Sequence, residues 1–142
     1  MKNISLIFVV LFSLSLSNCI PDVIVETDVD IGYKNNIGED LLDTATQNHF
    51  SVSSIHVYNV VKDIKNENHD LIVYNNESLN QYFLKVFLEF DTTLLKLNEL
   101  DTDTITCVID RSHHDTIIRK VWYNGILKWD DRRVPRSFTI LK

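Results

Sequence analysis

The stretch T-I-I-R-K-V-W-Y-N-G-I-L-K-W, residues 116–129, decides the fold of the C-terminal half of this chain. Asn124-Gly125 lies between two apolar runs. Both central positions of a type I′ turn need a positive φ, which Asn and Gly adopt most easily. Thr116–Tyr123 and Ile126–Trp129 are therefore predicted to form the two strands of an antiparallel hairpin.

Outward from this hairpin, residues alternate between apolar and polar in further short runs, as half-buried strands do. The predicted strands are Val23–Glu26, Leu71–Tyr74, Gln81–Phe90, Thr104–Arg111 and Ser137–Leu141. Two segments between them lack this clear pattern. Asp28–Glu39 is polar with two glycines and is predicted to be a linker, and Thr92–Asp103 is predicted to be a leucine-bearing connector with one helical turn.

The segment from Asp40 to about Asn66–Asn68 is predicted to be a long helix. Its apolar residues fall on one helical stripe and its flank: Leu41, Ala45, Val52 and Ile55, with Leu42, Val57, Val60 and Ile64. Acidic residues begin the segment and lysines end it, which suits the helix dipole. A single helix followed by four or five antiparallel strands buries its apolar face only by lying across the sheet. The expected fold class is therefore α+β.

In this order of elements the chain resembles the cystatin family. The resemblance covers Gly38 to Trp129. It rests on a glycine before the helix (Gly38 or Gly32), Phe50-Ser51-Val52 within the helix, the strand Tyr82-Phe83-Leu84-Lys85-Val86, and Lys120-Val121-Trp122 before a tight turn. It implies one long helix packed across an antiparallel sheet, and it implies inhibition of papain-like cysteine proteases by occlusion of their active-site cleft.

The chain departs from the cystatin pattern in the loops that such inhibitors insert into the protease. The first hairpin, Asn75–Leu79, lacks the Q-x-V-x-G motif, and neither Ser112–Asp115 nor Asn124-Gly125 contains the Pro-Trp pair of the second hairpin. The resemblance therefore implies a diverged binding surface. Its contact residues would be Gly38, Glu77, Ser78, Leu79, Trp122, Asn124 and Gly125.

Residues 1–19 have the organisation of a secretory signal peptide. Lys2 precedes an apolar run of about a dozen residues, and small serines follow. The run is shorter than the roughly 20 residues of a membrane span. Residues 20–142 are thus expected to be one secreted, monomeric domain without a membrane span. Lipidation of Cys19 in a loose lipobox is an alternative reading of the same segment.

Charge and modification sites narrow the expected partners. The net charge of −6 argues against nucleic acid, which is bound by basic surfaces. Asn76-Glu77-Ser78 is an N-glycosylation sequon, so Asn76 is expected to be glycosylated if the host is a eukaryote. Cys107 is expected either to pair with Cys19 or to be buried and reduced.

No pattern of residues predicts catalysis, a cofactor or a metal site. His113-His114-Asp115 is interpreted as a polar turn, and His49 and His56 as surface residues of the helix. The expected function is therefore binding of an extracellular protein, with a papain-like cysteine protease as the candidate. The alternative is a secreted carrier of a small ligand or a surface lipoprotein, and a carrier would need an interior cavity of at least ~300 Å³.

Overall fold

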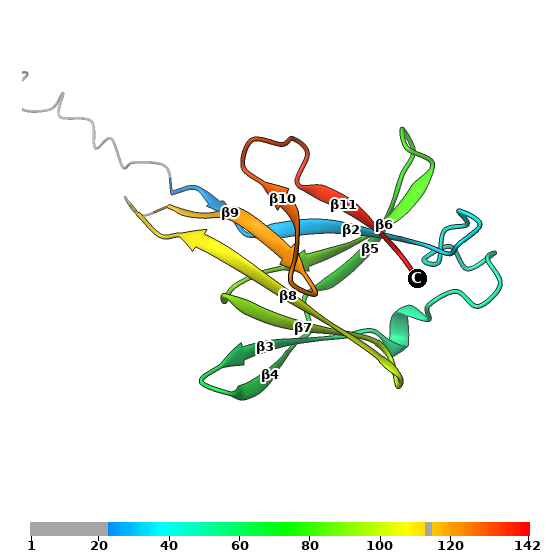
Figure 1. Cartoon of the computed structure of the whole chain (residues 1–142), viewed down its shortest axis with the longest axis horizontal. Coiled ribbons are helices and arrows are strands. Elements are labelled where there is room, and N and C mark those ends of the chain that lie inside the picture. The colour runs from blue at the N-terminus through cyan, green and yellow to red at the C-terminus, as the bar shows by residue number, and fades with distance from the viewer. Residues whose placement is uncertain (1–22, 113–114) are drawn as a thin grey trace, which may run out of the picture.

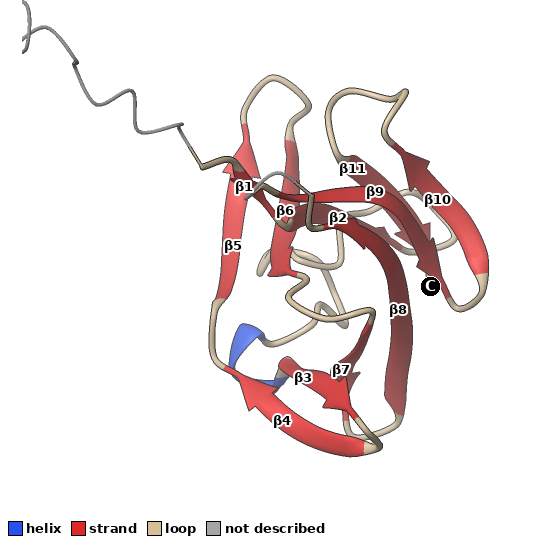
Figure 2. Cartoon of the chain, turned by 90° about the vertical axis from the view of Figure 1, so that its left-hand side faces the viewer, coloured by secondary structure: helices blue, strands red, loops and turns tan. Residues whose placement is uncertain are grey.

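Two β-sheets packed face to face form the chain, as a computed structural model of residues 23–112 and 115–142 shows (Figures 1 and 2). The larger sheet has the order β1 (Val25–Glu26), β9 (Thr116–Tyr123), β8 (Asp101–Asp110), β7 (Thr92–Asn98), β3 (His56–Val61) and β4 (Ile64–Asn68), with β10 (Ile126–Asp130) also paired to β9. The smaller sheet has the order β11 (Ser137–Leu141), β2 (Asp28–Lys34), β6 (Gln81–Phe87) and β5 (Leu71–Asn76). Among the strand pairs of the described residues, β1–β9 and β11–β2 are parallel and the others are antiparallel.

Alternating side chains from both sheets fill the space between them. Fully buried residues include Ile31 on β2, Leu84 on β6, Leu95 on β7 and Ile105 on β8. Each such aliphatic side chain contributes roughly 1.5–3 kcal/mol when it leaves water. This layer of apolar side chains is the core that holds the two sheets together.

The predicted long helix is wrong, and the fold is almost entirely β instead of α+β. Residues 41–48 form turns and bends, Val52–Ser54 is a single turn of 3-10 helix (η1), and β3 and β4 form a hairpin. The apolar residues near Val57 alternate with period two, and β-branched side chains favour strands. Lys62 and Asp63 both have positive φ and make the turn of this hairpin, which no continuous helix can contain.

Two further segments are strands where a linker and a connector were expected. Asp28–Lys34 is β2, a central strand of the smaller sheet, and Thr92–Asn98 is β7. Leu95 and Leu97 are both fully buried because they lie on the same face of β7, two residues apart. The other predicted strands are confirmed, with ends that shift by a few residues.

The predicted hairpin at Asn124-Gly125 is confirmed. Both residues have positive φ, +49° and +78°, and Tyr123 pairs with Ile126 across the turn. Among the described residues there is no helical segment with the length and apolar character needed to span a membrane. The expected signal peptide and Cys19 lie outside the described residues, as do His113 and His114.

Candidate functional site

Several connections between strands meet at one end of the molecule, which we call the loop end. β2 and its parallel neighbour β11 both finish there, and the antiparallel β6 begins there, so the 77–80 turn lies at this end. The side chain of Lys142, just after β11, contacts Asp101 and Asp103 at the start of β8, which brings the 99–100 turn to the same end. Figure 1 shows the 35–50 connection and these two turns on the right-hand side.

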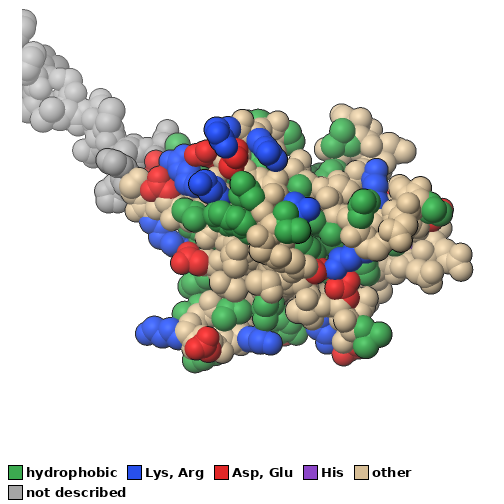
Figure 3. All heavy atoms as spheres, viewed as in Figure 1, with side chains coloured by type: hydrophobic (Ala, Val, Ile, Leu, Met, Phe, Trp, Pro, Cys, Tyr) green, Lys and Arg blue, Asp and Glu red, His purple; other side chains and the backbone are tan. Residues whose placement is uncertain are grey.

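Each connection at the loop end carries an exposed aliphatic side chain. Leu100 in the β7–β8 turn is 99% exposed, Ile37 in the 35–40 loop 80% and Leu79 in the β5–β6 turn 58%. Ile126, beside the β9–β10 turn, is 62% exposed. On the face seen in the space-filling view, hydrophobic side chains at the right-hand edge stand apart among polar ones (Figure 3). We refer to Ile37, Leu79, Leu100 and Ile126 as the apolar tips.

A buried polar network lies behind the tips and joins the two sheets. The hydroxyl groups of Tyr33 on β2 and Tyr123 on β9 are 3.0 Å apart, and the Tyr123 hydroxyl donates to Oδ2 of Asp103 at 2.5 Å. Burial raises the pKa of both tyrosines, so they stay protonated and able to donate. The network connects strands that belong to different sheets and therefore fixes their relative position at this end.

Asp103 is the centre of this network. Its carboxylate also accepts from Nζ of Lys142 at 2.6 Å and from the side-chain amide of Asn124 at 2.6 Å. Burial works to raise the pKa of Asp103, but the hydrogen bonds from Lys142, Tyr123 and Asn124 outweigh it and hold the pKa below its ordinary value. The ionised carboxylate thus fixes the β9–β10 turn against the start of β8.

The 35–50 connection is held to the smaller sheet by the side chain of Asp40. Its Oδ2 accepts from the backbone N–H of Tyr82 at 2.6 Å, and its Oδ1 accepts from the N–H of Leu42 at 2.9 Å. Gly38, at the apex of the same loop, has a φ of +88°, a conformation that glycine adopts without strain. The loop that carries Ile37 is therefore attached to the beginning of β6.

The structure brings most of the residues predicted as contact sites to the loop end. Gly38, Glu77–Leu79 and Asn124-Gly125 are all exposed there. Trp122 is the exception. It is half-buried and alternates with the buried Val121 and Tyr123, so it lies on the outer face of the larger sheet. Asn76 ends β5 beside the 77–80 turn, and its glycosylation stays a prediction.

Two other features of the loop end were not predicted from the sequence, the tips Ile37 and Leu100 and the Asp103 network. Ile37 and Leu100 lay in segments interpreted as linker and connector, although a lone aliphatic residue in a polar turn is a signal that can be read. The Asp103 network joins residues 33, 103, 123 and 142, and no sequence spacing indicates that these four residues meet.

Away from the loop end, three adjoining hollows lie at the opposite end of the sheets. Their volumes are about 370, 390 and 560 Å³, and Glu89 lines all three. We call them together the Glu89 trough. A further hollow of about 390 Å³ lies at the loop end between the β9–β10 hairpin and β11.

The other side chains that could react or bind a metal take part in local structural contacts. Cys107 is buried, its Sγ donates to the carbonyl of Phe90 at 3.3 Å, and burial raises its pKa to about 12. Among the residues that the structure describes, no three His, Cys, Asp or Glu side chains are grouped to hold a metal ion. His49 lies in a turn and His56 on β3 pairs with Glu67, so the two do not share a helix face.

Comparison with known proteins gives no relative: no family model, no curated protein and no solved structure matches the chain. The all-β architecture is not the fold that the cystatin resemblance implied. A relationship to cystatins stays a prediction that rests on the four short sequence pieces alone.

Proposed function

We propose that this chain is a secreted domain that binds a protein partner with its loop end. The observation that carries the proposal is the set of four apolar tips, each exposed by more than half: three lie on different connections, and Ile126 begins β10 directly after the 124–125 turn. Because these aliphatic side chains project from separate turns, they suit a concave apolar surface in which each tip occupies its own hollow.

The energy for such binding comes from removing the tips from water. Complete burial of one aliphatic side chain contributes roughly 1.5–3 kcal/mol, and a few buried anchors usually account for most of the affinity of an interface. The Asp103 network and the Asp40 contacts support the proposal because they order the turns before binding. Less conformational entropy is then lost on association.

The partner we propose is the active-site cleft of a papain-like cysteine protease. The loop end would block the cleft, with Leu79, Ile37 and the 124–125 turn as the contacts that enter it. This choice rests on the sequence resemblance and on the presence of several projecting turns at one end. It does not rest on a cystatin fold.

A role as an interior carrier of a small ligand has less support. Side chains such as Leu84, Leu95 and Ile105 are fully buried and fill the space between the sheets. The hollows described above are lined instead by loops and strand ends at the surface.

The test is a titration of a papain-like cysteine protease with the domain from Ile20 to Lys142, extended to high micromolar concentration. We expect inhibition by the natural sequence, weakened at least fivefold by Leu79→Ser and by Ile37→Ser. Ile64→Ser is the matched control, because Ile64 is 63% exposed, close to the 58% of Leu79, but lies on β4, away from the loop end. Absence of inhibition by a folded sample, or equal loss with Ile64→Ser, would contradict the proposal.

A further inference from the structure

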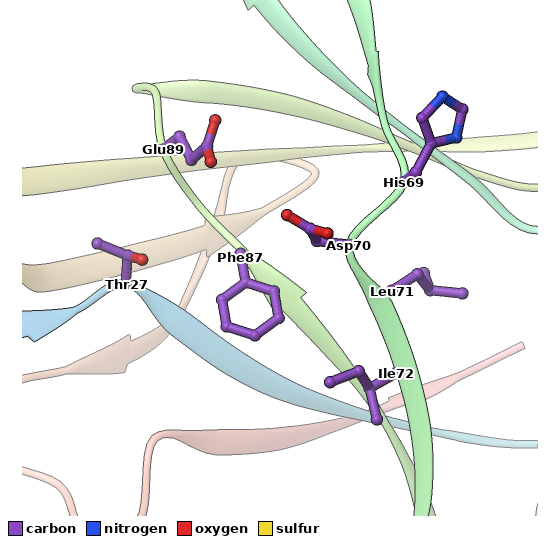
Figure 4. Close-up of a pocket in the computed structure, with 7 residues that line it drawn as sticks. All are labelled: Thr27, His69, Asp70, Leu71, Ile72, Phe87 and Glu89. Atoms are coloured by element: carbon purple, nitrogen blue, oxygen red, sulfur yellow. The ribbon is translucent and has the colours of Figure 1, made fainter.

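We propose that the Glu89 trough is a second binding site and that it takes an arginine-containing segment of a peptide. The site lies at the opposite end of the sheets from the apolar tips and does not depend on the function proposed for them. The argument begins with the hollow of about 370 Å³ drawn in Figure 4, which β5, β6 and the loops beside them enclose.

The floor of this hollow is apolar. Phe87 at the end of β6 contributes an aromatic ring and Ile72 of β5, about half exposed, contributes aliphatic surface, whereas Leu71 packs against the core on the other face of β5. A guanidinium group is weakly hydrated and stacks on aromatic rings, and the methylene groups of an arginine side chain cover apolar surface. The floor is therefore suited to a long side chain that is apolar along its length.

Two carboxylates lie on opposite walls above this floor. Figure 4 shows Asp70 and Glu89 directed toward one another over the ring of Phe87. Glu89 accepts a hydrogen bond at 3.3 Å from the side chain of Asn59, which is itself buried and held by Thr93. The walls of this first hollow are thus negative, and a planar cation with several donors is the group that complements them. The third hollow of the trough differs, because Lys62 and Arg111 line it and Arg111 donates to the backbone carbonyl of Glu89 at 2.9 Å.

These two carboxylates have no lysine or arginine partner among the described residues. Neighbouring acids do have basic partners: Glu67 contacts His56 at 2.7 Å, and Asp91 contacts Arg111 at 3.9 Å. Asp70 and Glu89 are therefore available to an external cation.

An unpaired donor in the adjoining hollow points to a peptide instead of a free cation. The side-chain amide nitrogen of Asn68, a half-buried residue, is itself buried and has no hydrogen-bond partner among the described residues, while the oxygen of the same amide accepts from the N–H of Asp70. A buried donor without an acceptor is costly, and a peptide carbonyl is a group that satisfies it. The second hollow thus gives the ligand's backbone a place beside the cation site.

The test is an NMR titration of the ¹⁵N-labelled domain with acetyl-Gly-Arg-Gly-amide, with the same peptide carrying citrulline as the neutral control. We expect saturable shifts of the amides of Asp70, Leu71 and Glu89, at least fivefold weaker binding with citrulline, and weakening by added salt. Asp70→Asn and Glu89→Gln should each reduce the affinity at least fivefold.

Asp63→Asn is the matched variant, because Asp63 is an exposed carboxylate in the β3–β4 turn that does not line the trough. It should bind the arginine peptide as the natural sequence does. Equal binding of arginine and citrulline peptides, shifts confined to the loop end, or no saturation at millimolar peptide would overturn the proposal. Unchanged thermal midpoints of the variants show that any loss is not a loss of folding.

Discussion

The loop end and the Glu89 trough use the same kinds of residue in opposite arrangements. At the loop end the charges are inside, where Asp103 and Lys142 neutralise each other, and the aliphatic side chains project. In the trough the apolar residues Phe87 and Ile72 form the floor, and the carboxylates of Asp70 and Glu89 lie above it without a lysine or arginine partner among the described residues.

The difference shows which partner each region suits. Projecting aliphatic side chains gain free energy only when a concave surface removes them from water. A hollow with an apolar floor and charged walls instead takes a single long cationic side chain. Two sites on one small domain can therefore select different ligands without sharing a residue.

The largest effect is expected from Asp103→Ala, compared with Asp70→Ala. Removal of Asp103 takes away the acceptor of the Tyr123 hydroxyl and of the Asn124 amide in a buried site and leaves Lys142 with Asp101 alone, and we expect a loss of about 3 kcal/mol. Asp70 is exposed and unpaired, so Asp70→Ala should change stability by less than about 0.5 kcal/mol. Urea denaturation measures the free energy of unfolding of both variants, and similar losses in the two would contradict this difference between the loop end and the trough.

The stability of the protein should depend on pH through Asp103 and Lys142, whose pKa values are both shifted. Because the pKa of Asp103 is lowered from an ordinary value of 3.8, its stabilisation is present above that value and is lost as the pH falls through the lowered pKa. The pKa of Lys142 is raised above 10.5, since the hydrogen bonds to Asp103 and Asp101 outweigh the opposing effect of burial. Its stabilisation is therefore present below 10.5 and is lost as the pH rises through the raised pKa.

Denaturation curves between acid and neutral pH, measured for the natural sequence and for Asp103→Asn, isolate the part that belongs to Asp103. The stability difference between the two should shrink in acid. A difference that stays constant down to about pH 2 would show that folding does not lower the pKa of Asp103, which would contradict the account.

A smaller effect is expected at the two glycines of the loop end. Gly38 and Gly125 have φ of +88° and +78°, and a Cβ at either position would meet no neighbouring atom within 4 Å. Alanine there costs only the left-handed backbone conformation, about 1 kcal/mol. A loss above about 2 kcal/mol in thermal denaturation would mean that these turns are packed more tightly than the structure shows.

The smallest effect on folding is expected from the tips themselves. Leu100→Ser and Ile37→Ser remove side chains that are already in water, so stability should stay within about 0.5 kcal/mol of the natural sequence. Calorimetry checks this value. A larger loss would indicate that the tips are part of the core, which would remove them as candidate contacts.

Sequence predicted the C-terminal half of the fold because strand alternation and turn chemistry there agree. Asn124-Gly125 fixes the β9–β10 hairpin, and the runs on either side have the period of two. The prediction failed at residues 40–68. There the apolar residues are spaced widely enough to fit a helical arc, and the pairing of β3 with both β4 and β7 decides for strands.

The candidate sites could be predicted in part. Exposed turns such as Glu77–Leu79 follow from local sequence. The trough does not, because Asp70, Phe87 and Glu89 meet only when β5 pairs with β6 and the chain turns back after it. The Asp103 network likewise requires the two sheets to be in register.

Native-state hydrogen exchange tests most directly the central claim, that the Asp103 network orders the loop end before any partner binds. Three backbone amides are informative. That of Thr104 donates to the side-chain oxygen of Asn124 at 2.8 Å, and that of Asn124 donates to the carbonyl of Thr104 at 2.8 Å. That of Lys142 donates to the carbonyl of Lys34 at 2.9 Å. We predict exchange that is slow in the natural sequence and strongly accelerated at all three amides in Asp103→Asn. Fast exchange in the natural sequence, or no change in the variant, would contradict the account.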